Sequence, residues 1–388
     1  MPDGAEPFTL TVASGIEKIA ATEWDACAGN ANPFVTHAFF SALESSASAV
    51  AATGWQAQHL ALHGADGRLA ACAPVYLKSH SYGEYVFDWS WADAYERAGG
   101  RYYPKLQVAV PFSPVTGPRL LAPPDGPAGV TETLAAGLVQ LAETTRVSSL
   151  HVTFSTEAEC RLLSRYGFLL RTGIQYHWQN RGYTNFEDFL GDLSSRKRKA
   201  IRKERAAAAG HDVVIRELAG SAIEERHWDA FYGFYRDTVE RKSAHAYLSR
   251  AFFSALGRGL GRRVLLVMAE TPAGLPVAGA LHLVGDDTLY GRYWGAIGAY
   301  DRLHFEMCYY RAIDFAIQNG LARIEAGAQG EHKIQRGYLP QPTWSAHWIA
   351  DHRLRTAVDR FLVRERSAVD EAIERLTALS PFRHEPPA

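Results

Sequence analysis

The segment from Glu325 to Arg336 gathers the widest variety of chemically active side chains in the sequence. It reads EAGAQGEHKIQR, so a glycine-rich turn brings carboxylate, imidazole, ammonium and guanidinium groups into close succession. Charged residues just past the carboxyl end of a strand are where open α/β sheets bind ligands. His332 is suited to proton transfer near neutral pH, and Lys333 or Arg336 could hold a phosphate or stabilise an oxyanion. We expect a ligand or reaction site here, with an ordinary polar loop as the alternative.

A second stretch with reactive side chains precedes the first. A strand-like run ends in Arg292, Tyr293 and Trp294, and a helix is expected to begin near position 304. On that helix Glu306 shares a face with the tyrosines at positions 309 and 310 and is expected to meet them. A buried, hydrogen-bonded glutamate can act as a general base. The alternative is a structural glutamate that accepts a hydrogen bond from a tyrosine hydroxyl.

The third stretch is aromatic. Residues 82–91 read YGEYVFDWSW, and residues 101–107 read RYYPKLQ. Loops this rich in aromatic residues are often binding surfaces. Four of their side chains are therefore expected to contact substrate: Trp89, Trp91, Lys105 and Gln107. A lid packed on the domain beneath it is the alternative interpretation.

The fourth stretch, residues 194–205, is basic. It contains seven Lys or Arg residues and one Glu, a local charge of +6 in a chain whose net charge is −1. On a helix, Arg198, Arg202 and Arg205 share one face. Such a face suits phosphates or an RNA backbone. The alternative is a solvated helix face.

The elements that must position these residues are indicated by an internal repeat. The hexapeptide AFFSAL occurs at 38–43 and again at 251–256. Each copy is followed by two strand-like runs joined by a glycine-containing turn, a hairpin pattern. Because the order of elements repeats together with the letters, we expect two copies of one supersecondary plan.

Helices and strands are expected to alternate along the whole chain, which is typical of mixed α/β layers. Thr36 and Asn185 are expected N-caps. The expected helices cover 37–45, 130–145, 157–166, 194–209, 224–242, 247–259, 304–319 and the chain from 353 on. The expected strands cover 56–63, 68–78, 84–88, 149–154, 168–179, 212–218, 262–270, 276–284, 287–294, 322–326 and 343–350. The fold class is therefore α/β (α+β), with mixed central sheets flanked by helices in two tandem domains, 1–180 and 181–388.

Composition narrows the classes of function. A chain of 388 residues has the length of two domains, and 47% hydrophobic residues suffice for two cores. With 41 basic and 42 acidic residues, the global charge favours neither a DNA-coating nor a membrane-surface protein. No apolar run reaches the roughly 20 residues of a transmembrane helix.

Cysteine spacing and terminal composition indicate a cytoplasmic protein. The four cysteines form no CxxC pair and are expected to be free thiols in a reducing compartment. The first ten residues lack a basic start and an apolar run, so no secretory signal is expected. No metal site is expected, and no phosphate-binding loop or nucleophile elbow is present.

The basic segment, the PVAGA hairpin at 276–280, the AIDFA run at 312–316 and the EAG strand end at 325–327 occur together in an order that resembles the FemAB-like proteins. The resemblance extends over nearly the whole chain. It implies two GNAT-type domains and the transfer of an acyl or aminoacyl group to an amine, such as a peptidoglycan precursor or another small molecule. In bridge-forming relatives the donor is an aminoacyl-tRNA, and Lys333 stands where some relatives carry a catalytic lysine.

Two departures leave the donor open between acyl-CoA and aminoacyl-tRNA. The glycine turn that holds the coenzyme A pyrophosphate at a helix N-terminus is not evident, and the matching junction at 295–299 reads GAIGA without a leading Gln or Arg. The helical hairpin with which some bridge enzymes hold tRNA is not evident either. No tightly bound cofactor is expected.

These observations lead to an N-acyltransferase hypothesis. The candidate catalytic residues are Glu306, Glu325, His332 and Lys333. The residues expected to contact substrate are Trp89, Trp91, Lys105, Gln107, Arg292, Tyr293, Trp294, Arg336 and Tyr338, and those expected to hold phosphates are Arg198, Arg202 and Arg205. The expected partners are an amine substrate and, where the donor is an aminoacyl-tRNA, tRNA; DNA is not expected. The alternative is a ligand-recognition protein of the same fold that does not catalyse a reaction.

Overall fold

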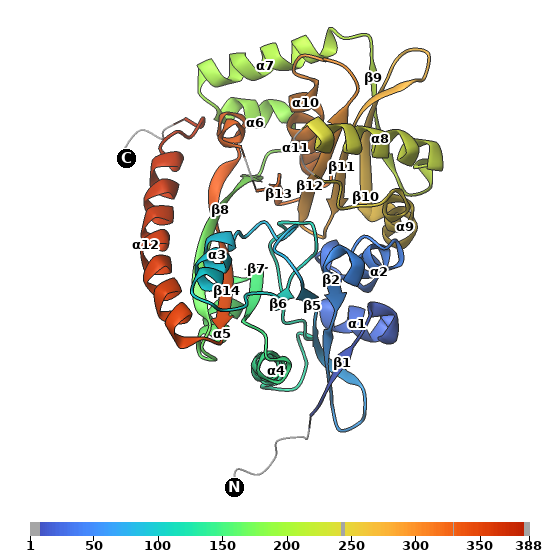
Figure 1. The fold of residues 1–388 in the computed structure, drawn as a ribbon. Helices are drawn as coiled ribbons and strands as arrows, with labels where there is room; N and C mark the ends of the chain where they lie inside the picture. The colour runs from blue at the N-terminus through green and yellow to red at the C-terminus, as the bar shows by residue number, and fades with distance from the viewer. Residues whose placement is uncertain (1–7, 242–244, 329, 384–388) are drawn as a thin grey trace. The chain divides into compact units, whose positions relative to one another are not determined.

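The computed structural model describes residues 8–241, 245–328 and 330–383. The chain divides into two compact units (Figure 1). Unit 1 comprises residues 1–30, 34–173 and 342–370, and unit 2 comprises 31–33, 174–341 and 371–388. This division differs from the expected split at residue 180, because the chain returns to unit 1 after leaving unit 2.

Unit 1 contains two β-sheets. Its strands are β1 (Thr9–Ala13), β2 (Trp55–Ala57), β3 (His59–His63), β4 (Leu69–Ala73), β5 (Val75–Lys78), β6 (Lys105–Val108), β7 (Ser149–Ser155) and most of β14 (Leu339–Ile349). The orders are β1-β3-β4 and β2-β5-β6-β7-β14. Among these neighbours β6 and β7 are parallel, and the other pairs are antiparallel.

The helices of unit 1 pack on these sheets. They are α1 (Ala21–Ala28), α2 (His37–Ser45), α3 (Trp89–Arg97), α4 (Val130–Thr145), α5 (Glu157–Ser164) and most of α12 (His352–Thr377), with the short turns η1 (Ile16–Lys18), η2 (Pro33–Val35) and η3 (Ala51–Thr53). Helix α4 packs against β3, β4 and β7. The predicted cap of α2 is confirmed, since the Thr36 hydroxyl accepts a hydrogen bond from the backbone N–H of Phe39.

Three local predictions in unit 1 are wrong. The strands expected at 56–63 and 68–78 are each split, the second at Pro74, so that their parts join different sheets. Proline has no N–H for a ladder hydrogen bond, which explains the second break. Residues 84–88 form no strand, and the helix Trp89–Arg97 follows them directly.

Unit 2 contains one sheet with the order β8-β13-β12-β11-β10-β9. Its strands are β8 (Leu169–Gln179, with its first residues in unit 1), β9 (Val214–Ala219), β10 (Val264–Glu270), β11 (Pro276–Val284), β12 (Thr288–Ala296) and β13 (Arg323–Glu325). Strands β12 and β13 are parallel, and the other neighbours are antiparallel. The buried core includes Trp178, Leu289 and Ile313.

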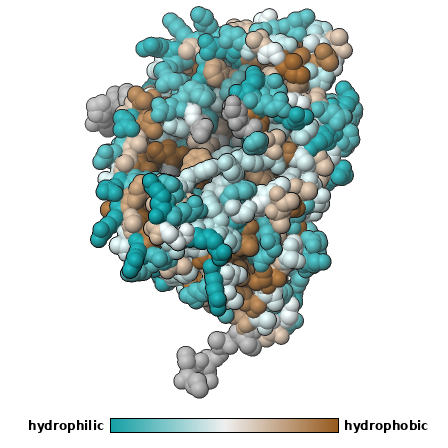
Figure 2. All heavy atoms as spheres, viewed as in Figure 1, coloured by the Kyte–Doolittle hydropathy of each residue, from teal (hydrophilic) through white to brown (hydrophobic). Residues whose placement is uncertain are grey.

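The helices of unit 2 include the predicted basic helix. They are α6 (Phe186–Asp192), α7 (Ser195–Ala209), α8 (Glu225–Arg241), α9 (Arg250–Leu260), α10 (Leu303–Phe305) and α11 (Arg311–Gln318), with the turns η4 (Gly220–Ala222), η5 (Gly261–Arg263), η6 (Glu306–Tyr310) and η7 (Glu331–Arg336). Helix α8 packs on β11 and β12 (Figure 1). The predicted cap of α6 is confirmed, because the Asn185 side chain accepts a hydrogen bond from the N–H of Asp188. Figure 2 shows hydrophilic side chains over α7.

The two units repeat one plan. The AFFSAL copies lie in α2 and α9, and a shorter echo, Trp-Asp-Ala, lies at 24–26 in α1 and at 228–230 in α8. In each unit this helix pair precedes antiparallel strands and then a parallel pair, β6 with β7 or β12 with β13. Among the described residues, no helix combines the length and apolarity that crossing a bilayer requires.

Candidate active site in unit 2

The site begins where two parallel strands separate. β12 pairs with β13 through Thr288, Leu289 and Tyr290. β13 then ends at Glu325, whereas β12 continues to Ala296. Beyond Tyr290, therefore, this edge of β12 has no partner strand within the described ranges. A strand edge without a partner strand is a place where an extended ligand chain can add as a further strand.

A β-bulge places Arg292 at this edge. In the ladder with β11, Tyr293 faces Leu281 and Gly291 faces His282, so Arg292 is the extra residue. Its side chain is 3% exposed, and Nη2 lies 3.5 Å from Oε2 of Glu325, which is fully buried. A buried guanidinium and a carboxylate thus fix the geometry at the point of separation.

A cavity of about 90 Å³, here called the β12 pocket, opens at the same point. Its lining comes from β11, β12, the helical segment after residue 303 and the end of β13: Ala280, Leu281, His282, Gly291, Arg292, Tyr293, Trp294, His304, Cys308, Tyr309 and Ala326. The structure therefore brings three of the predicted substrate contacts, Arg292, Tyr293 and Trp294, to one cavity.

Tyr309 and His332 form a hydrogen-bonded pair beside the β12 pocket. The Tyr309 hydroxyl lies 2.9 Å from Nε2 of His332. Burial lowers the pKa of His332, and the charges of Arg336 and Lys333 lower it further. His332 is therefore neutral at pH 7 and able to accept a proton. Burial also raises the pKa of Tyr309, so its hydroxyl retains its proton.

Lys333 holds the turn that follows β13. Its Nζ donates hydrogen bonds to the carbonyl oxygens of Ala326, at 2.6 Å, and Gly327, at 3.1 Å. Burial lowers the pKa of Lys333 to about 8, with Arg292 adding to the effect. In this arrangement Lys333 orders the segment below the β12 pocket. Gln329 in the same turn lies outside the described residues.

The expectation that Glu306 meets Tyr309 and Tyr310 is wrong. The Glu306 carboxylate accepts hydrogen bonds from Arg205 and Arg311 instead. The reason is the π-helical turn η6, which has more residues per turn than an α-helix and so changes which side chains share a face. Glu306 is held in an ionic cluster and does not line the β12 pocket.

Arg336 and Tyr338 also lie inside unit 2. Arg336 donates two hydrogen bonds, of 2.7 and 2.8 Å, to the carboxylate of Glu204 and stacks on the Phe305 ring. Tyr310 donates to the same carboxylate. The fully buried Tyr338 donates a hydrogen bond to the Tyr309 carbonyl oxygen. Both predicted substrate contacts therefore support the segment that carries Tyr309.

Most of the substrate contacts predicted in unit 1 are buried. Trp89 is 43% exposed, but Trp91, Lys105 and Gln107 belong to the interior. Lys105 donates hydrogen bonds to Glu84 and Asp88, and Gln107 donates to the Thr153 hydroxyl. An aromatic loop does not reveal which of its side chains point inward, so only Trp89 is in reach of a solute.

The basic helix α7 divides its charges between two roles. Arg205 forms ion pairs with Glu306 and Asp314, so its charge is neutralised within unit 2. Arg202 forms an exposed pair with Glu187, and Arg198 is half-buried. The exposed basic side chains are Arg196, Lys199, Arg202 and Lys203. The solvated face therefore differs from the expected set of 198, 202 and 205.

Four of the lining side chains that carry a polar atom or sulfur were not among the candidate site residues, although Tyr309 was expected beside Glu306: His282, His304, Cys308 and Tyr309. Burial lowers the pKa of His282 to about 4, so it is neutral. His304 packs against Trp294 and Tyr309. The sequence could have indicated His304, because it lies at the start of the predicted helix and that helix follows the strand that carries Trp294.

Each unit has one parallel strand pair flanked by antiparallel strands, and solved structures share this fold. The chain superposes on FemX with a TM-score of 0.56 at 11% identity, covering 88% of this chain and 98% of FemX. For L-PGS from Bacillus licheniformis the TM-score is 0.51 at 9% identity, with 92% and 99% covered.

Residues 15–384 match the FemAB-like family, described as peptidoglycan biosynthesis/recognition, and the chain belongs to this family. No curated protein sequence matches it. The two solved structures support the fold, and the family match covers both units.

Proposed function

We propose that the protein transfers an acyl or aminoacyl group from an activated donor to an amine, and that the reaction takes place at the β12 pocket. The observation that carries this proposal is the separation of β12 from β13 beside Arg292, Tyr309 and His332. An extended donor can align along this strand edge, and the neutral imidazole can accept a proton. Membership of a family described as peptidoglycan biosynthesis/recognition supports a peptidoglycan precursor as the acceptor.

The proposed step conserves atoms and charge. The amine nitrogen forms a bond to the acyl carbon, and the bond from that carbon to the leaving oxygen or sulfur breaks. One proton passes from the amine to the leaving group. The Tyr309 hydroxyl is placed to carry this proton because it is hydrogen-bonded to His332. A backbone N–H of β12 would stabilise the oxyanion formed between the two events.

The donor is proposed to be an aminoacyl-tRNA or an acyl-CoA. The exposed basic side chains of α7 would bind its phosphates: Arg196, Lys199, Arg202 and Lys203. Affinity for tRNA should then fall steeply with salt, and a shallow dependence would argue for the smaller donor.

The test is direct. The protein is incubated with a panel of aminoacyl-tRNAs and acyl-CoAs together with amines, including a peptidoglycan precursor, and new amides are sought by mass spectrometry. Amide formation that is lost in Tyr309→Phe supports the proposal. Amide formation unaffected by Tyr309→Phe and His332→Gln would place the reaction elsewhere.

One observation favours recognition without catalysis. The two carboxylates first considered as bases, Glu306 and Glu325, are both held by arginines. Binding of the precursor without any amide product from the whole donor panel would favour this second function.

A further inference from the structure

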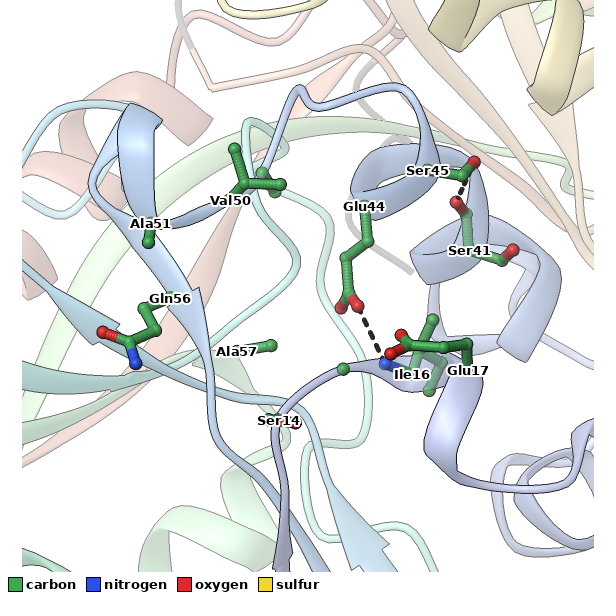
Figure 3. Close-up of a pocket in the computed structure, with 12 residues that line it drawn as sticks. Ser14, Ile16, Glu17, Ser41, Glu44, Ser45, Val50, Ala51, Gln56 and Ala57 are labelled. Carbon is green, nitrogen blue, oxygen red and sulfur yellow. Dashed lines mark hydrogen bonds between the residues drawn. The ribbon is translucent and has the colours of Figure 1, made fainter.

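Unit 1 contains a cavity that the proposed reaction does not use. It has a volume of about 380 Å³, which lies within the range of small-molecule sites. We call it the α2 cavity. Its walls are the turn at 14–17, the last turns of α2, the segment 49–51 and strand β2 (Figure 3).

The lining of the α2 cavity is acidic and apolar. Glu17 and Glu44 supply carboxylates, and alanines together with Val50 supply an apolar wall. None of the lining residues is a lysine, arginine or histidine. A phosphate or carboxylate ligand would find no cationic partner in this lining, whereas a cation would find two anions.

Hydrogen bonds fix the Glu44 carboxylate in place, and the carboxylate can still accept a further hydrogen bond. Oε2 accepts the Ile16 N–H at 2.8 Å, while Oε1 lies 2.7 Å from Nε2 of His59 and accepts the Tyr76 hydroxyl at 3.2 Å. A carboxylate offers about four acceptor positions, so one remains on Oε2. The side chain is 11% exposed, and Figure 3 shows its carboxylate among the residues that line the cavity.

The second copy of the repeat provides an internal comparison. Glu44 follows AFFSAL in α2, and Gly257 follows AFFSAL in α9. A Cβ on Gly257 would lie 3.0 Å from the Trp228 ring, so an indole takes the place of the carboxylate side chain. Ser254, the counterpart of Ser41, is hydrogen-bonded to Glu225 and Arg250. The carboxylate is therefore particular to the first copy.

We propose that the α2 cavity is a binding site for a small primary amine. The ammonium group would donate to the remaining acceptor position of Glu44, with Glu17 at the rim adding a second negative charge. A short alkyl body would pack on Val50 and Ala57. Glu17 also pairs with Lys18 at 3.8 Å. Both side chains are more than 60% exposed, so this ion pair is weak and competes little with an ammonium ligand. This site is independent of the reaction proposed for unit 2.

The test uses three probes of similar size and different charge: n-butylamine, 1-butanol and butyrate. Saturation-transfer NMR at pH 7 measures the binding of each probe to the full chain. We expect n-butylamine to bind at least tenfold more tightly than the other two. Equal binding of all three, or no binding of n-butylamine up to tens of millimolar, would overturn the proposal.

Variants assign any binding to the α2 cavity. Glu44→Gln should weaken n-butylamine binding at least tenfold, and Ser41→Leu, which fills the cavity without removing the carboxylate, should abolish it. Glu143→Gln, an exposed charge change on α4, is the matched control and should change nothing. If Glu44→Gln does not fold, Ser41→Leu still decides, because unchanged binding in that variant would place the amine elsewhere. No readout depends on acyl transfer.

Discussion

Arg205 donates a 3.1 Å hydrogen bond to each carboxylate oxygen of Glu306, a residue 101 positions further along the chain. The same guanidinium bonds Asp314 at 2.8 Å and lies over the Phe186 ring. A side chain that the basic helix pattern assigned to phosphate binding therefore fastens α7 to the segment that carries the β12 pocket.

Replacing Arg205 with leucine should destabilise the protein. Glu306 is almost fully buried and would keep only Arg311 as a cationic partner. We expect a loss of about 2–3 kcal/mol in the free energy of unfolding, measured with urea. Arg202→Leu, which breaks an exposed pair, should cost less than about 1 kcal/mol. Equal losses in the two variants would contradict this role for Arg205.

A pair of buried histidines predicts how the stability of unit 1 depends on pH. Nδ1 of His151 lies 2.7 Å from Nδ1 of His347. Burial lowers the pKa of His151 to about 3, and Lys105 adds to this effect, whereas Asp88 opposes it. Burial also lowers the pKa of His347, protonation of His151 would lower it further, and the charge of Arg171 acts in the same direction.

Both histidines are neutral in the folded protein, whereas in the unfolded chain they bind protons below about pH 6.5. Stability should therefore be lost as the pH falls from about 6.5 toward 3. For His151 the loss is roughly 2 kcal/mol at pH 5, and His347 adds to it. Urea unfolding at pH 7 and pH 5 measures this loss. His151→Leu/His347→Leu should flatten the dependence, and His352→Gln at the exposed start of α12 should leave it as it is. An unchanged slope in the double variant would assign the dependence to other groups.

Tyr309 and His332 should act as one catalytic unit. Tyr309→Phe removes the hydroxyl that His332 contacts, and His332→Gln removes the proton acceptor. Each change should lower kcat by about 10²–10⁴-fold, and the double variant should lose little more than the stronger single variant. Amide formation followed by mass spectrometry gives the rates. Multiplicative losses would show that the two residues act separately.

The sequence was informative where one side chain or a repeated pattern determines an element. The Thr36 and Asn185 caps, the basic helix and the AFFSAL repeat all depend on local letters, and the structure contains each of them. The same holds for Arg292, Tyr293 and Trp294, which follow one another in the strand that borders the pocket.

Features set by distant partners were not predictable in this way. The π-helical turn redirects Glu306 toward Arg205, and nothing near either residue signals it. The sequence around Lys105 is typical of a solvent-exposed lysine in an aromatic loop. In the structure its buried ammonium group donates a hydrogen bond to Asp88, 17 positions earlier. The return of 342–370 to unit 1 is likewise a property of the completed sheets.

Two glycines of β12 differ in how much room a Cβ atom would have. A Cβ on Gly295 would lie 2.2 Å from the Phe234 carbonyl oxygen in α8, whereas a Cβ on Gly291 would meet its nearest neighbour, His282, at 3.5 Å. Gly295→Ala must push α8 away from the sheet, because a backbone atom cannot rotate aside. We expect it to cost at least about 2 kcal/mol of unfolding free energy.

Gly291→Ala is the matched control, because it adds the same methyl group to the same strand at ordinary contact distance. We expect it to change the unfolding free energy by less than about 1 kcal/mol. Thermal and urea unfolding of the two variants provide the comparison. If Gly295→Ala were as stable as Gly291→Ala, α8 would not pack on β12 as closely as the structure shows, and the β12 pocket would lose the rigid strand on which the proposed reaction depends.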